Sequence, residues 1–238
     1  MKTDIVIPLG GGSPFCNEEL RFALRSAEKF VKDLHTVWIM SDCAPDWLQN
    51  VRILPVPDRH RRNKDANLFD KLIFASKMPE AAELLIWMCD DNAFLAPFDA
   101  EKAQYIFNPR GKEYFMKNQG NRWHQRMANT FRYLEERGIK LPYNFEPHVP
   151  TVYRKEELQV LNGIDYAKEP GFCVNMLLYG LLGRRGEIPQ NVVKAHAETR
   201  DAKVDFTGKL FAGYNDAGFP AMLEKFIELF PEKSKYES

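Results

Sequence analysis

The chain has 238 residues, and its content of 45% hydrophobic and 13% aromatic residues is typical of a packed globular protein. Lysine plus arginine and aspartate plus glutamate each number 33, so the net charge is zero and no overall field favours nucleic acid or an anionic membrane. We therefore expect no nucleic-acid partner, and local basic side chains have to bind any anionic ligand.

The sequence predicts neither a membrane-spanning segment nor a set of disulfide-bonded or zinc-binding cysteines. No N-terminal segment combines the basic flank and apolar core of a signal peptide, and no apolar run reaches the ~20 residues that cross a bilayer. The four cysteines, at positions 16, 43, 89 and 173, show no Cys-x-x-Cys spacing, which indicates neither a zinc site nor a disulfide framework. We expect a protein without a transmembrane segment, located in the reducing cytoplasm.

The first half of the chain alternates predicted strands and helices. Residues 4–9 form a β-rich run that breaks into a glycine loop, and a helix is expected to begin near Asn17, whose side chain would cap it. Strands are then predicted at residues 36–40 and 51–56, and a second helix at residues 66–76. The short connections predict an α/β fold, with a mostly parallel sheet flanked by helices on both faces.

The most informative stretch is residues 84–95, where an apolar run stops at Asp90, Asp91 and Asn92 and then resumes. A strand interior would not tolerate two unpaired carboxylates, because each is costly to bury. We therefore expect them at the strand's carboxyl end, where open α/β sheets bind ligands. Their oxygens suit Mn²⁺ or Mg²⁺. The alternative is an Asp-Asp-Asn turn that binds nothing.

The alternation fades in the second half, which is predicted to be more helical and irregular. A strand is expected at residues 104–107, and helices at residues 123–134, 156–161, 172–182 and 219–230. No internal repeat, low-complexity segment or long linker divides the chain. Residues 1–238 are therefore expected to form a single domain.

Four ordered segments carry a family resemblance: residues 17–29, Trp38-Ile39-Met40-Ser41-Asp42, Pro45-Asp46-Trp47-Leu48 and residues 90–95. Together they resemble the second conserved region of the Stealth-type sugar-phosphate transferases of capsule synthesis. They are equally similar to a group of bacterial and phage glycosyltransferases of the GT-A fold. The resemblance covers residues 4–95, with a weaker match at residues 148–150. Stealth proteins open with a Trp-Val-Asp-Gly-like signature that this chain lacks, which weakens the phosphotransferase interpretation.

The resemblance implies a GT-A-like (Rossmann-like) domain that moves a sugar from a nucleotide-diphosphate sugar to a glycan or other hydroxyl acceptor, in surface polysaccharide or glycan synthesis. Residues 1–97 would bind the nucleotide sugar and the metal, and residues 98–238 would form the acceptor site. Glu146 and Asp205 are the carboxylates considered as an acceptor base. Two alternatives stay open: a Stealth-type sugar-1-phosphate transferase, and a non-catalytic nucleotide-sugar or glycan-binding module.

The resemblance also indicates where the metal and the catalytic groups lie. Many such enzymes have an Asp-x-Asp pattern, and the corresponding residues here are Asp90 with Asn92, or Cys89 with Asp91. His148, in a loop bracketed by two prolines, is expected to bind metal or act as an acid/base. The expected ligands of Mn²⁺ or Mg²⁺ are therefore Asp90, Asp91, Asn92 and His148, with Asp91 and His148 catalytic.

Candidates for donor binding come from several loops. The glycine loop can bring backbone N–H groups to a diphosphate, and lysines can offset its charge. A glycine-hinged loop at residues 206–216 is expected to close over the substrate. Ordinary turns and solvated basic surfaces explain the same residues without a ligand. The expected substrate-binding residues are Leu9, Gly10, Gly11, Ser13, Arg21, Asp42, Lys64, Asn67, Lys71 and Lys209.

Overall fold

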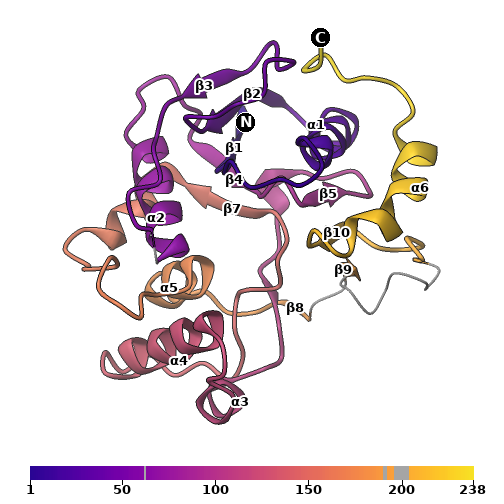
Figure 1. The fold of residues 1–238 in the computed structure, drawn as a ribbon. Helices are drawn as coiled ribbons and strands as arrows, with labels where there is room; N and C mark the ends of the chain where they lie inside the picture. The colour runs from indigo at the N-terminus through magenta and orange to yellow at the C-terminus, as the bar shows by residue number, and fades with distance from the viewer. Residues whose placement is uncertain (62, 190–191, 196–203) are drawn as a thin grey trace.

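The computed structural model describes residues 1–61, 63–189, 192–195 and 204–238 (Figure 1). Its main sheet has five strands in the order β3-β2-β1-β4-β7. β1, β2, β3 and β4 run parallel, and β7 runs antiparallel beside β4. The bounds of these strands are β1 (Thr3–Ile7), β2 (Leu34–Met40), β3 (Arg52–Leu54), β4 (Leu84–Trp87) and β7 (Thr151–Arg154).

Helices cover both faces of this sheet, and its central strands β1 and β4 are buried on both sides. On β1, Val6 packs into the layer that contains α2 (Lys64–Ser76) and α5 (Val174–Leu181). Its neighbours Ile5 and Ile7 point the other way, toward α1 (Glu18–Phe30), as the twofold period of a strand requires. Figure 1 shows α1 on one side of the sheet and α2 on the other. The predicted α/β fold, with a mostly parallel sheet flanked by helices, is confirmed.

The second half of the chain is interleaved with the first. It supplies β7 to the main sheet, and β10 (Phe211–Tyr214) pairs antiparallel with β5 (Asn92–Phe94) and parallel with β9 (Val192–Ala195). The remaining elements are β6 (Ile106–Phe107), paired with β8 (Ile188–Pro189), the helices α3 (Lys112–Lys117), α4 (Arg122–Glu135) and α6 (Phe219–Leu229), and 3₁₀ turns at Ala100–Lys102 and Lys155–Leu161. Among the described residues, no helix is both long and apolar enough to cross a membrane.

The predicted cap of α1 is wrong. Asn17 has the left-handed backbone (φ 61°), and its side chain makes no capping hydrogen bond. The hydroxyl of Ser13 accepts instead, from the N–H of Phe15 (3.1 Å) and of Asn17 (3.0 Å). This hydroxyl also donates to Glu19, so the glycine loop is tied to the first turn of the helix.

The predicted lid at residues 206–216 is also corrected. Its central part is β10, a fully buried strand that lies between β5 and β9. A hinge at Gly213 is incompatible with this placement, because opening it would break backbone hydrogen bonds on both sides of the strand. Residues 206–210 and 215–216, on either side of the strand, keep the loop character that the glycine pattern indicated.

Candidate metal and ligand site

A cavity of about 1060 Å³ opens at the carboxyl ends of β1 and β4. These two strands are neighbours, but β2 and β3 lie on one side of β1 while β4 lies on the other. This is the switch point where open α/β sheets keep their ligand crevice. The cavity is lined by residues 8, 10, 12 and 13 after β1, and by residues 87–92 at the end of β4. The predicted position of the acidic motif is therefore observed.

A tight turn after β4 fixes this motif. The Asn92 side-chain oxygen accepts from the backbone N–H of Cys89 (3.2 Å), while the Asn92 N–H donates to the Cys89 carbonyl (3.2 Å). Asn92 is only 1% exposed. This amide oxygen closes the turn, so Asn92 has a structural role beside Asp91, and its expected metal ligation stays a prediction.

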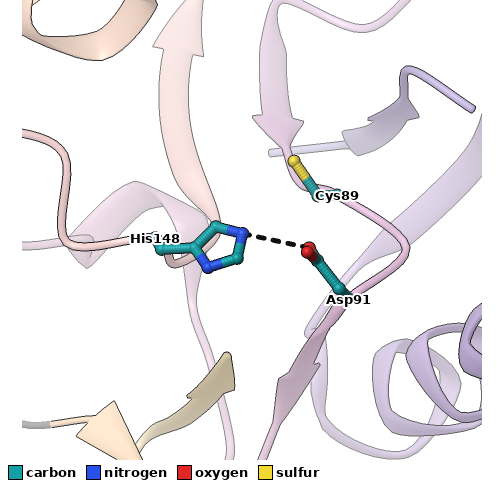
Figure 2. Close-up of side chains that lie close together, drawn as sticks. All are labelled: Cys89, Asp91 and His148. Atoms are coloured by element: carbon teal, nitrogen blue, oxygen red, sulfur yellow. Dashed lines mark hydrogen bonds and ion pairs between the residues drawn. The ribbon is translucent and has the colours of Figure 1, made fainter. Parts of the chain in front are cut away.

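His148 lies opposite this turn, brought there by the loop that precedes β7. Its backbone has the left-handed conformation (φ 58°), which is uncommon for a residue with a side chain. Its Nε2 lies 3.1 Å from Oδ1 of Asp91, and the dashed line in Figure 2 marks this contact. The two residues are 57 positions apart in the chain. The structure thus brings together the two residues that were expected to be catalytic.

A third side chain completes a possible metal cluster. One ligand atom each from Cys89, Asp91 and His148 lies within 4.8 Å of the others. Two ligands of one ion, bound at ~2.0 to ~2.3 Å, lie somewhat closer than this limit, so a modest side-chain adjustment brings them together. A sulfur, an oxygen and a nitrogen fit an ion softer than the expected Mn²⁺ or Mg²⁺, both of which favour oxygen ligands. Asp90 is not part of this cluster, although it lines the same cavity.

Burial shapes the charge of the cavity. It raises the pKa of Asp90 to about 6, with the neighbouring Asp91 charge acting in the same direction. It also raises the pKa of Glu146 to about 8, against hydrogen bonds from the Met176 N–H (2.9 Å) and the Asn175 amide (3.2 Å). Burial lowers the pKa of Lys194 to about 8, although Asp91 and Glu146 favour its charged form. Such groups change charge near neutral pH.

Lys194 was not predicted from the sequence. It lies on β9 and pairs in register with Gly213 of β10, which in turn pairs with Asn92 of β5. This three-strand register places Lys194 on the cavity wall. The sequence offers a short β-rich run around it, but no local signal shows which strand it joins.

Several predicted donor-binding residues line the cavity: Gly10, Ser13, Lys64, Asn67 and Lys71. Lys71 is buried and holds the glycine loop, since its ammonium donates to the Leu9 carbonyl (3.2 Å) and pairs with Asp58 (2.8 Å). Asn67 forms two hydrogen bonds with the backbone of His60, which orders the preceding basic loop. Of these residues, Lys64 presents an exposed cation, at the first turn of α2.

Other predicted residues lie elsewhere among the described residues. The Arg21 guanidinium bonds to Glu237 (3.0 Å) and stacks on Trp47, so it holds the C-terminal segment against α1. Asp42 is exposed beyond β2. Residues at three more predicted positions are not among those that line the cavity: Leu9, Gly11 and Lys209. Arg21 was predicted through the resemblance, which carries no information on its partner more than 200 residues away.

Comparison of the chain with protein-family models and with curated proteins gave no match.

Proposed function

We propose that the protein is a metal-dependent glycosyltransferase with a GT-A-like fold, which moves a sugar from a nucleotide-diphosphate sugar to an acceptor hydroxyl in glycan or surface-polysaccharide synthesis. The observation that carries the proposal is the Asp91–His148 pair at the carboxyl end of β4. It lies in a cavity of about 1060 Å³, slightly above the ~300–1,000 Å³ typical of small-molecule sites. The four-segment resemblance supports the reaction class.

The cavity offers what a diphosphate requires. Lys64, Arg110 and Lys194 line it from three different elements or loops, and their cations can offset the diphosphate charge. The amino-terminal end of α2, at Lys64, adds the positive end of a helix dipole. Asp91 and His148 would hold the divalent ion. When bound, that ion supplies Lewis-acid stabilisation of the negative charge on the departing nucleoside diphosphate.

The transfer also needs a group that accepts a proton. The bond from the anomeric carbon to the diphosphate oxygen breaks, a bond from that carbon to the acceptor oxygen forms, and the hydroxyl proton has to leave. Glu146 lines the cavity and is held by two hydrogen bonds, and its pKa of about 8 is near the operating range of a general base. Asp205 is exposed and is not among the described lining residues. We therefore assign the role of general base, which takes the proton of the acceptor hydroxyl, to Glu146.

A panel of UDP-, GDP- and CMP-sugars, incubated with the protein and a divalent metal, tests the proposal. Release of nucleoside diphosphate supports glycosyl transfer, and release of nucleoside monophosphate supports sugar-1-phosphate transfer instead. Tight binding without turnover would identify a non-catalytic binding module. Asp91→Ala should abolish turnover. The matched control Asp165→Ala should keep it, because Asp165 is exposed and lies outside the lining of the cavity.

A further inference from the structure

The cluster after β4 contains a thiol, which the acidic reading of the motif does not include. Cys89 lies two residues before Asp91, and its sulfur lies within 4.8 Å of the nearest ligand atoms of Asp91 and His148. Figure 2 shows the Asp91 side chain pointing from the turn after β4 toward the imidazole on the opposite loop, with the Cys89 side chain on the same turn. The three donors are thus a sulfur, a carboxylate oxygen and an imidazole nitrogen.

Hydrogen bonds around the turn hold two of these donors in place. The Asn92 amide oxygen is already engaged by the Cys89 N–H, and Asn92 is 1% exposed. The same bond, with its return bond from the Asn92 N–H to the Cys89 carbonyl, fixes the backbone of Cys89. A second bond anchors the other side of the turn, where the Tyr214 N–H donates to the Asp91 carbonyl (3.2 Å). Cys89 and Asp91 are therefore preorganised on a rigid turn.

We propose that Cys89, Asp91 and His148 form a thiolate–carboxylate–imidazole site that selects a thiophilic divalent ion of the zinc class over Mg²⁺. The inference rests on the proposed function for the site's role and names the ion it uses. Thiolate and imidazole ligands suit Zn²⁺ and Co²⁺, whereas Mg²⁺ demands oxygen ligands in a near-ideal octahedron. Three protein ligands are also the number found in catalytic zinc sites, which keep one position open for water or substrate.

Cobalt substitution tests the sulfur ligand directly. The full chain is freed of metal with a chelator and titrated with Co²⁺. A sulfur-to-cobalt charge-transfer band should appear in the wild type and in Cys43→Ser, whose cysteine is exposed and lies outside the cavity lining. Cys89→Ser should lose that band, and its affinity for Zn²⁺ should fall at least tenfold. Direct titration should show that the wild type binds Zn²⁺ more tightly than Mg²⁺. Melting curves establish that both variants are folded.

The outcomes separate this inference from the proposed glycosyl transfer. Cobalt binding without a charge-transfer band, or Zn²⁺ binding that is equal in Cys89→Ser and wild type, overturns the thiolate site. If a sulfur-bound ion is found but no nucleotide sugar is turned over, the metal inference stands and the proposed function fails. If Mg²⁺ supports turnover and binds as tightly as Zn²⁺, the function stands and the ion selectivity is wrong.

Discussion

The carbonyl oxygen of His148 lies against the α-carbon of Gly213, so closely that a Cβ at residue 213 would approach it to 2.6 Å. β10 therefore supports the loop that carries His148, and it does so through a residue without a side chain. Since the loop also holds His148 in the left-handed conformation, the position of the imidazole depends on this contact.

We expect Gly213→Ala to displace His148 from Asp91. The added methyl group would meet a backbone carbonyl between two packed segments, and overpacking of this kind costs about 1–3 kcal/mol. The variant should melt at a lower temperature and bind Co²⁺ or Zn²⁺ at least tenfold more weakly. Gly120→Ala is the control, because a Cβ there meets nothing within 4 Å. Metal affinity at the wild-type level in Gly213→Ala would show that the contact does not position the imidazole.

Asp91→Ala should remove the gain in nucleoside-diphosphate affinity that a divalent metal provides. Asp91 would lose both a direct ligand and its 3.1 Å bond to His148. Calorimetry of UDP and GDP, with and without Mn²⁺ or Zn²⁺, measures the effect. Equal affinities with and without metal in the wild type would contradict the assignment.

His148→Ala should lower turnover at least tenfold, which corresponds to about 1.4 kcal/mol of lost transition-state stabilisation. The melting temperature should change little, because the His148 side chain is 37% exposed and its hydrogen bond joins it to Asp91, which is itself partly exposed. Paired measurements of kcat and of thermal unfolding separate the two effects. An activity loss that follows the loss of folded protein would indicate a structural residue.

The features of the site that could be predicted from the sequence are those set by residues close together in the chain. The acidic motif was placed correctly at the carboxyl end of β4, because an apolar run and the cost of buried carboxylates act over a few residues. The bond by which the Asn92 amide closes the turn was not predicted, because the sequence does not show which group this side chain contacts. The partner of Asp91 was suggested by the resemblance, and no local rule would have found His148.

Residues fixed by distant pairing were the ones that sequence reasoning missed or misplaced. Lys194 reaches the cavity through the register of β9 on β10, which is set by contacts between remote segments. Arg21 was expected at the ligand, but its position is set by Glu237, a residue at the other end of the chain. The glycines at 208 and 213 suggested a lid, because a buried strand that contains glycine and aromatics resembles a loop in composition.

Lys194→Met should weaken nucleoside-diphosphate binding about tenfold at neutral pH, because the Lys194 ammonium lines the cavity and would be lost. Methionine keeps a side chain of similar apolar length. The pKa of Lys194 is lowered to about 8 by burial, so the wild-type affinity should itself decline as the pH rises through that value. Lys209→Met is the matched control, since this lysine is not among the described lining residues. Equal losses in the two variants would remove Lys194 from the site.

Glu146→Gln should flatten the pH dependence of stability in the metal-free protein. Burial raises the pKa of Glu146 from 4.5 to about 8, so between these values the folded chain keeps a proton that the unfolded chain releases. The free energy of unfolding should therefore fall as the pH rises through this window, with a slope from this group that approaches ~1.4 kcal/mol per pH unit. Glutamine cannot ionise, so the variant lacks that slope.

Urea unfolding at several pH values between about 5 and about 9 measures the difference between the two curves. Asp90, whose pKa burial raises to about 6, contributes to both proteins and cancels in the comparison. Glu156→Gln, at an exposed position, should run parallel to the wild type. Turnover should be lost in Glu146→Gln at every pH, because the glutamine amide cannot take the proton from the hydroxyl of the acceptor substrate. Parallel stability curves would mean that Glu146 is ionised in the folded protein at neutral pH, and full turnover would assign the base to another residue.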